Sequence, residues 1–151
     1  MIPERCVHNI LASWPVGVLS TWGRNVIHSV PVVFVAIDDE IISPVDGKPK
    51  SGKELQRVVD LERDSRFTLL LQHYSENWEE LWWLRLNGHG KVETLRDEQH
   101  REKVTSALRR KYSQYSSVDV LDDSVRVLRL KVEHTSAWAW AGLDWLTGQF
   151  S

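Results

Sequence analysis

The sequence has little of several features that define protein classes. Cys6 is the only cysteine among 151 residues, so an intrachain disulfide is impossible and nothing indicates an oxidising compartment. The net charge of −2 provides no general attraction for nucleic acid or anionic membranes. No apolar run approaches the roughly 20 residues that span a bilayer, and residues 1–14 lack the apolar centre of a signal peptide. We therefore expect a single cytoplasmic domain over residues 1–151, without nucleic-acid or membrane partners.

Signatures of hydrolytic and metal chemistry are also lacking. The six histidines show no pair at metal-ligand spacing, and neither Ser43 nor Cys6 has a nearby base that would mark a nucleophile. Three acidic pairs look like paired carboxylates: Asp38-Asp39, Glu79-Glu80 and Asp122-Asp123. Adjacent residues point to opposite faces in a strand and to water in a turn, so we interpret these pairs as turn and cap residues. We therefore predict no metal site, and we assign no catalytic residue.

The order of the expected elements favours an antiparallel β fold with accessory helices. Strands are expected over residues 16–22, 26–37, 40–45, 66–74, 81–95 and 125–140, with turns at 23–25 and 38–39. Helices are expected from Pro3 to near Trp14, from Ser51 onward, and after Thr94 and Asp97, which resemble a capping box. This order lacks the regular β-α alternation of a doubly wound sheet. Six such strands predict a small barrel whose interior is filled by side chains, so a ligand would bind outside it or at a subunit interface.

Two prolines fall within the expected strands. Pro31 and Pro44 cannot donate a ladder hydrogen bond. Each therefore indicates an edge, a bulge or a place where a ligand approaches the backbone.

A basic segment precedes the second expected helix. Residues 47–53 contain two glycines, a serine and three lysines, Lys48, Lys50 and Lys53. Exposed N–H groups at a helix start favour a phosphate, and lysines add positive charge. The alternative is a solvated turn with no ligand. The segment also fits part of a nucleotide-binding P-loop, but Glu54 stands where Ser or Thr should hold magnesium, and Pro49 removes a donor.

The sequence is rich in tryptophan, with eight residues of this type. Large rings bury area or stack on flat ligands, and two groups stand out: Trp78, Trp82 and Trp83, and then Trp138, Trp140 and Trp145. Core or dimer packing would account for most of them. The alternative is stacking on a planar heterocycle, which Arg85 could also reach because it shares a strand face with Trp83.

Three segments, taken in order, resemble a known family. They are residues 28–34 (HSVPVVF), 45–50 (VDGKPK) and 81–88 (LWWLRLNG). Over nearly its whole length the chain resembles the pyridoxamine 5′-phosphate oxidase-like split barrels, and among them it is most similar to the small deazaflavin-dependent oxidoreductases. The resemblance implies a mainly β fold, a six-stranded antiparallel split β-barrel of the FMN-binding type.

The resemblance also implies a homodimer in which FMN or the deazaflavin coenzyme F-420 lies in a groove built by both chains. Residues 28–31 would flank the ring through backbone groups, residues 43–46 would run beneath it, and the lysines would hold its phosphate. The implied cofactor-binding residues are His28, Ser29, Val30, Pro31, Ser43, Pro44, Val45, Asp46, Lys48, Lys50, Lys53, Trp82, Trp83, Arg85, Trp138 and Trp140. A hydride would pass between the cofactor and an unknown small molecule.

Two other functions stay open at this point. A non-catalytic protein could bind or sense flavin or haem in the same groove, and haem would need a histidine ligand. A dimer without any ligand would use the lysines only to solvate a turn. Oxidation of pyridoxamine phosphate itself is disfavoured, because the sequence offers no second set of basic and polar residues for a further phosphate.

Overall fold

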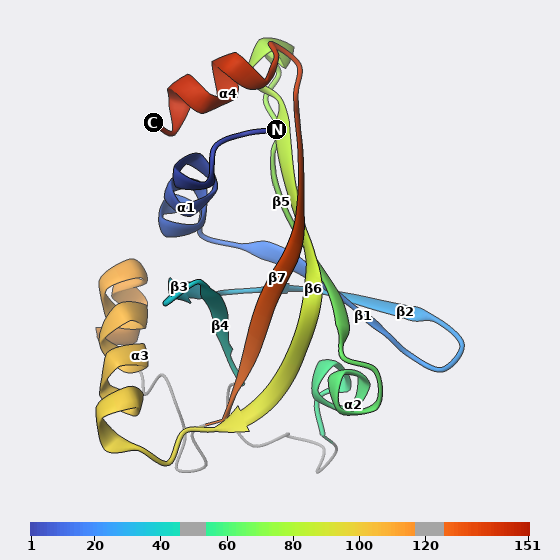
Figure 1. The fold of residues 1–151 in the computed structure, drawn as a ribbon, viewed down its shortest axis with the longest axis vertical. Coiled ribbons are helices and arrows are strands. Elements are labelled where there is room, and N and C mark those ends of the chain that lie inside the picture. Colours follow the sequence, from blue (N-terminus) through green and yellow to red (C-terminus); the bar gives the residue numbers. More distant parts are fainter. Residues whose placement is uncertain (46–53, 117–125) are drawn as a thin grey trace.

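The structure is a computed structural model that describes residues 1–45, 54–116 and 126–151. Long curved strands form its centre, and helices surround them (Figure 1). In chain order the elements are α1 (Glu4–Ser13), β1 (Gly17–Trp22), β2 (Ile27–Val32), β3 (Val35–Ile37), β4 (Glu40–Pro44), α2 (Gln56–Arg63), β5 (Arg66–His73), the 3₁₀ helix η1 (Trp78–Glu80), β6 (Trp82–Thr94), α3 (Glu98–Lys111), the 3₁₀ helix η2 (Ser113–Ser116), β7 (Arg126–Ala139) and α4 (Leu143–Gln149).

The described strands form one antiparallel sheet of seven strands in the order β2-β1-β5-β6-β7-β4-β3. The predicted mainly β fold with accessory helices is confirmed, whereas the predicted number of six strands is wrong. Residues 26–37, expected as one strand, divide into β2 and β3, which are the two edges of the sheet. Phe34 lies between them and is fully buried. Because this ring is buried in the core, the chain leaves β2 here and continues as β3 at the opposite edge of the sheet.

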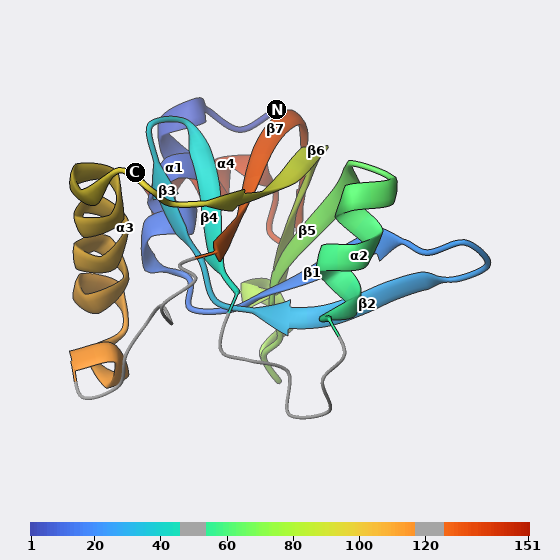
Figure 2. The ribbon, with the colours of Figure 1, turned by 90° about the horizontal axis from the view of Figure 1, so that it is seen from below.

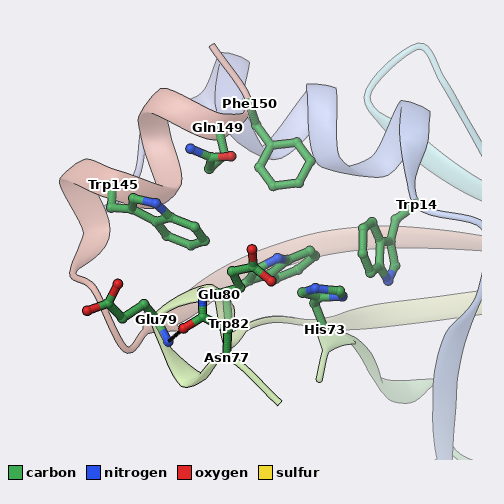
Figure 3. Close-up of a pocket in the computed structure, with 9 residues that line it drawn as sticks. All are labelled: Trp14, His73, Asn77, Glu79, Glu80, Trp82, Trp145, Gln149 and Phe150. Atoms are coloured by element: carbon green, nitrogen blue, oxygen red, sulfur yellow. Dashed lines mark hydrogen bonds between the residues drawn. The ribbon is translucent and has the colours of Figure 1, made fainter. Parts of the chain in front are cut away.

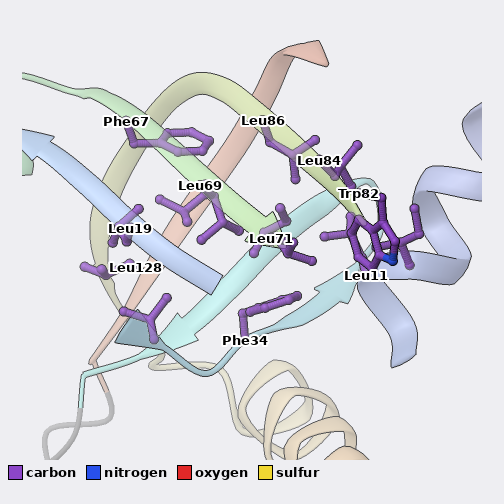
Figure 4. Close-up of a cluster of buried hydrophobic side chains, with 14 of the residues drawn as sticks. Leu11, Leu19, Phe34, Phe67, Leu69, Leu71, Trp82, Leu84, Leu86 and Leu128 are labelled. Atoms are coloured by element: carbon purple, nitrogen blue, oxygen red, sulfur yellow. The ribbon is translucent and has the colours of Figure 1, made fainter. Parts of the chain in front are cut away.

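The main buried cluster of the sheet includes residues of both α1 and α2. Alternation along β5 and β6 directs Phe67, Leu69, Leu84 and Leu86 into it, and each is at most 1% exposed (Figure 4). α1 adds Ile10, which is also fully buried. Burying a side chain of this size stabilises the fold by about 1.5–3 kcal/mol. The alternation that predicted these strands therefore also supplies the core.

The helices lie on both sides of the long strands. α1, α3 and α4 lie on one side, and α2 lies on the other, next to hairpin β1–β2 (Figure 1). Figure 2 shows the same separation of α3 from α2 and shows the hairpin projecting beyond α2. No helix in the described ranges is long and apolar enough to cross a membrane.

The helix boundaries differ from prediction at three places. The second helix begins at Gln56, and Ser51 itself is outside the described residues. The capping box is wrong: Thr94 ends β6, and Asp97 is itself the N-cap of α3, accepting a 3.2 Å hydrogen bond from the backbone N–H of Gln99. α4 was not predicted. It packs against β7. It also meets α1 at the other end of the chain, where Asn9 donates to the carbonyl of Phe150, the C-cap of α4.

The second hairpin turn is confirmed. Asp38 and Asp39 join β3 to β4 with φ angles of 49° and 66°. Positive φ at both central residues matches the twist of the flanking strands and suits Asp better than most residues. The Asp38-Asp39 pair is therefore a turn, as its sequence indicated.

Candidate functional site

A buried carboxylate joins two strands to a helix. Asp60 of α2 is 1% exposed, and its Oδ2 accepts a hydrogen bond from Oγ1 of Thr21 at 2.8 Å and lies 2.7 Å from Nδ1 of His28. Its Oδ1 accepts from Nε2 of Gln56 at 2.9 Å. Burial opposes ionisation of this carboxyl, but the hydrogen bonds from Gln56, Thr21 and His28 outweigh it and lower the pKa of Asp60. The ionised carboxylate therefore holds the ring of His28 in place.

His28 opens onto a cavity of about 690 Å³ between hairpin β1–β2 and α2. Its side chain is 40% exposed, and because Nδ1 faces Asp60, Nε2 is the nitrogen left for a ligand. The other residues around the cavity are Arg24, Asn25, Val26, Gln56, Val59, Glu62 and Arg63. Two arginines suit an anion, and a histidine oriented by a carboxylate can hold or move a proton.

The predicted segment 28–31 lies on an edge of the sheet. It belongs to β2, which pairs only with β1 among the described strands, so Pro31 stands opposite Val18 on an edge, as its missing N–H indicated. Pro44 instead ends β4, which lies between β3 and β7. The free edge of β2 leaves backbone groups that a ligand can use.

The predicted segment 43–46 is attached to the end of β2. Ser43 is 1% exposed, and its Oγ donates a 2.8 Å hydrogen bond to the carbonyl of Val33, which directly follows β2. Pro44 and Val45 are buried as well. The structure thus holds Ser43 two residues beyond the segment of His28 to Pro31, while Asp46, Lys48, Lys50 and Lys53 are outside the described residues.

One face of the sheet connects the edge strand to β6 through polar side chains. Ser29 stands opposite Ser20, with 2.8 Å between the two Oγ atoms. Ser20 in turn stands opposite Thr68, whose Oγ1 donates to Oδ1 of Asn87 at 2.7 Å. Directly paired residues share a face, as do residues two apart in a strand. Ser29 and Arg85 therefore lie on the same face, and His28 and Val30 point to the other.

Trp83 and Arg85 share that face, as predicted. The guanidinium carbon of Arg85 lies 4.9 Å from the centre of the Trp83 ring, and Trp138 stands opposite Trp83 on β7. Trp82 points to the opposite side and is only 4% exposed. It cannot line the same surface as Trp83 and Arg85, because neighbouring residues of a strand face opposite ways.

The C-terminal tryptophans are exposed but do not continue a single strand. Trp138 is 40% and Trp140 is 53% exposed. β7 ends at Ala139, so Trp140 follows the strand, and its ring packs edge-on against Trp78 at 5.7 Å. Trp138 therefore extends the surface formed by Trp83 and Arg85, whereas Trp140 follows the end of β7, beside the start of β6.

The family model of pyridoxamine 5′-phosphate oxidase matches residues 4–139. The chain belongs to this family. The match includes every described candidate residue except Trp140, which lies just beyond it. No curated protein matches the chain significantly.

Solved structures share the fold of this family member at low sequence identity. A conserved hypothetical protein of Mycobacterium tuberculosis superposes with a TM-score of 0.71 at 19% identity, over 92% of this chain and 86% of that one. An FAD-binding protein of Mesorhizobium loti gives 0.61 at 16%, over 91% and 94%. A heme-binding protein of Mycobacterium smegmatis gives 0.61 at 14%, over 92% and 59%. These similarities establish the fold.

Asp60 is the functional candidate that sequence reasoning missed. The sequence feature that could have marked it is a carboxylate on the apolar side of α2, next to Leu61 and four residues after Gln56. A buried carboxylate needs polar partners, so this position could have been marked for a side chain on another element. The identity of that partner, His28, depends on how β2 is placed.

Other reactive groups add no second centre. Residues 1–45, 54–116 and 126–151 contain no group of three or more His, Cys, Asp or Glu side chains that could hold a metal ion. Cys6 is buried, and burial raises the pKa of its thiol. A thiol in that state is not an activated nucleophile.

Proposed function

We propose that this chain is an oxidoreductase that binds FMN or the deazaflavin coenzyme F-420 as a homodimer and transfers a hydride to or from a small organic molecule. Membership of the pyridoxamine 5′-phosphate oxidase family and the likeness to an FAD-binding protein support a flavin ligand. The observation that carries the proposal is the hydrogen bond from Ser43 to Val33. It holds segment 43–46 beside Val33, two residues after segment 28–31, and the family resemblance assigns both segments to the ring.

The described residues suit a flat ring with a phosphate. The free edge of β2 offers backbone groups, and Trp83 with Arg85 offers a wall that stacks and carries positive charge. Arg24 and Arg63 face the cavity beside α2. Gln56, the first residue of α2, lines the same cavity, and we assign the phosphate to that end together with Lys48, Lys50 and Lys53.

The protein's own residues bind, orient and manage protons. A bound flavin or deazaflavin supplies the hydride chemistry. His28 is kept in one orientation by Asp60 and can hold a proton at Nε2 on the cavity side. Its role in the reaction is to give or take the proton that accompanies hydride transfer.

A second copy would cover the surface that one chain leaves open. Val26 and Ile27, at the tip of the projecting hairpin β1–β2, are 55% and 57% exposed, and Trp138 is 40% exposed. Exposed apolar groups of this size favour an interface. In the proposed homodimer the cofactor groove lies between the two barrels, and Trp83 and Arg85 of one copy approach the β2 edge of the other.

The test is titration of ligand-free protein with FMN and separately with F-420, followed by cofactor absorbance and calorimetry. We expect saturable micromolar binding of one of them, and a loss of roughly tenfold or more when Lys48, Lys50 and Lys53 are all replaced by Ala. The matched control replaces two exposed lysines of the sheet, Lys91→Ala and Lys131→Ala, and should bind as the wild type does. Failure of both cofactors to bind would overturn the proposal.

A haem-binding function is the second candidate, and the likeness to a heme-binding protein favours it. The exposed histidine His134 on β7 would be an axial ligand, because it stands opposite Asn87 and so lies on the face of Trp83 and Arg85. Titration with haemin would then give a sharp Soret band that His134→Ala broadens. A wild-type spectrum equal to free haemin would exclude this function.

A further inference from the structure

We propose that the cavity between α4 and the adjoining ends of β5 and β6 binds a small organic cation, a substituted ammonium compound. The cavity has a volume of about 520 Å³. It is lined by Trp14, His73, Asn77, Glu79, Glu80, Trp82, Trp145, Gln149 and Phe150 (Figure 3). Nothing in the proposed flavin chemistry uses these residues.

Aromatic rings make up most of the wall. Figure 3 shows Trp145 and Phe150 on the side of α4, facing Trp82 and His73 across the cavity, with Trp14 at one end. The Trp82 ring centre lies 4.7 Å from that of Trp14 and 5.5 Å from that of Phe150. The faces of such rings carry negative potential and attract a cation.

Carboxylates set the charge of the cavity. Glu79 and Glu80 both line it, and the nine lining residues include no lysine or arginine. Glu80 accepts a 2.8 Å hydrogen bond from Oγ of Ser75 through Oε2, which holds its carboxylate near the rings. The two carboxylates repel anions, and a neutral ligand gains no electrostatic attraction from them. Rings combined with carboxylates select a cation.

The walls are held in place by contacts within the chain. Nε1 of Trp14 donates to the carbonyl of Gln72 at 3.1 Å, and Nδ2 of Asn9 donates to the carbonyl of Phe150 at 2.7 Å. Trp82 is almost fully buried. Because α1, α4 and β5 already fix these rings, binding needs little further ordering.

The volume indicates the size of the ligand. A cavity of 520 Å³ falls within the roughly 300–1,000 Å³ of small-molecule sites. It has room for an ammonium head with further substituents. The cavity is also separate from the proposed flavin surface, because Trp82 and Trp83 point to opposite sides of β6.

The experiment compares choline with dimethylbutanol, its uncharged isostere in which carbon replaces nitrogen, at constant ionic strength. Calorimetry measures affinity, and indole N–H signals in ¹⁵N NMR spectra report the location. We expect choline to bind about tenfold more tightly than dimethylbutanol. We also expect it to shift the signals of Trp14, Trp82 and Trp145 but not that of Trp83. Equal binding of the two compounds, or no binding of choline, would overturn the proposal.

Two variants and two matched controls test the residues. The double variant Glu79→Gln, Glu80→Gln and the single variant Trp145→Leu should each weaken choline binding by about fivefold or more. Glu76→Gln, in the same connector, and Tyr74→Leu, an exposed aromatic residue outside the cavity, should leave it unchanged. Flavin titration should be the same in all four, which separates this proposal from the proposed function. Weakening by the controls equal to that by the variants would refute the assignment.

Discussion

Nδ1 of His28 lies 2.7 Å from Oδ2 of Asp60, so an imidazole on a sheet edge is anchored by a carboxylate buried in a neighbouring helix. Thr21 and Gln56 complete the hydrogen bonds of that carboxylate. The arrangement couples a candidate functional group to the docking of α2 on the sheet. A change at Asp60 should therefore affect both stability and the behaviour of His28.

Asp60→Asn should lower the free energy of unfolding by about 2 kcal/mol, because buried donors lose an ionised acceptor. Urea unfolding at neutral pH measures the loss. The difference from wild type should shrink as pH falls, since the lowered pKa of Asp60 means that its stabilisation exists above the unfolded-state pKa and is lost on acidification through the folded-state pKa. Glu62→Gln, an exposed change on the same helix, is the control and should have little effect. A difference that grows in acid would contradict the prediction.

Lys111 should make stability rise in mildly alkaline solution. Its Nζ donates to the carbonyls of Leu11 and Phe34, and burial lowers its pKa to about 8. The unfolded chain, with an ordinary lysine pKa of about 10.4, binds more protons between these values, so stability increases with pH there. Urea unfolding from about pH 8 to about pH 10 should show this rise in wild type relative to Lys111→Met. Parallel pH curves for the two proteins would argue against it. Burial also raises the pKa of Tyr112 to about 12. Above the ordinary tyrosine pKa the unfolded chain therefore binds fewer protons, and stability falls again with pH.

Gly88→Ala should be severely destabilising. A Cβ at this position would collide with the backbone carbonyl of Lys131 at the bulge where β6 changes register with β7. Backbone cannot yield as a side chain can, and we expect a loss of about 2 kcal/mol or more in thermal or urea unfolding. Gly148→Ala in α4 meets nothing within 4 Å and should be neutral or stabilise by up to about 1 kcal/mol. Equal effects of the two substitutions would count against the bulge as the cause.

Trp83→Ser combined with Trp138→Ser should weaken the proposed homodimer. The two residues stand opposite each other, and Trp138 is 40% exposed in the single chain. Large aromatic residues dominate interface energies, so sedimentation velocity should place dissociation of the variant at a concentration roughly tenfold higher. Trp78→Ser, also exposed but located on η1, is the control. A wild type that is monomeric at every concentration would refute the dimer itself.

Most of the strands could be predicted from sequence because one of their faces is buried. β5 differs from its predicted range by one residue at its C-terminal end and β6 by one residue at each end, since alternation of apolar and polar side chains is a local property. The division of residues 26–37 into β2 and β3 could not be predicted from the local sequence pattern. It follows from burial of Phe34 and from placing β2 and β3 on opposite edges, which requires all the other strands.

The same limit applies to the candidate site. Sequence alone indicated that Trp83 and Arg85 share a face, because strand geometry dictates it, and it marked residues 28–31 and 43–46 through resemblance. Only the tertiary structure decided that Ser43 bonds to Val33, that Asp60 anchors His28 and that Trp82 lines a different cavity. Short-range spacing determines which way a side chain points along its own strand or helix. The atoms that it meets belong to elements brought together only when the sheet curves around its core.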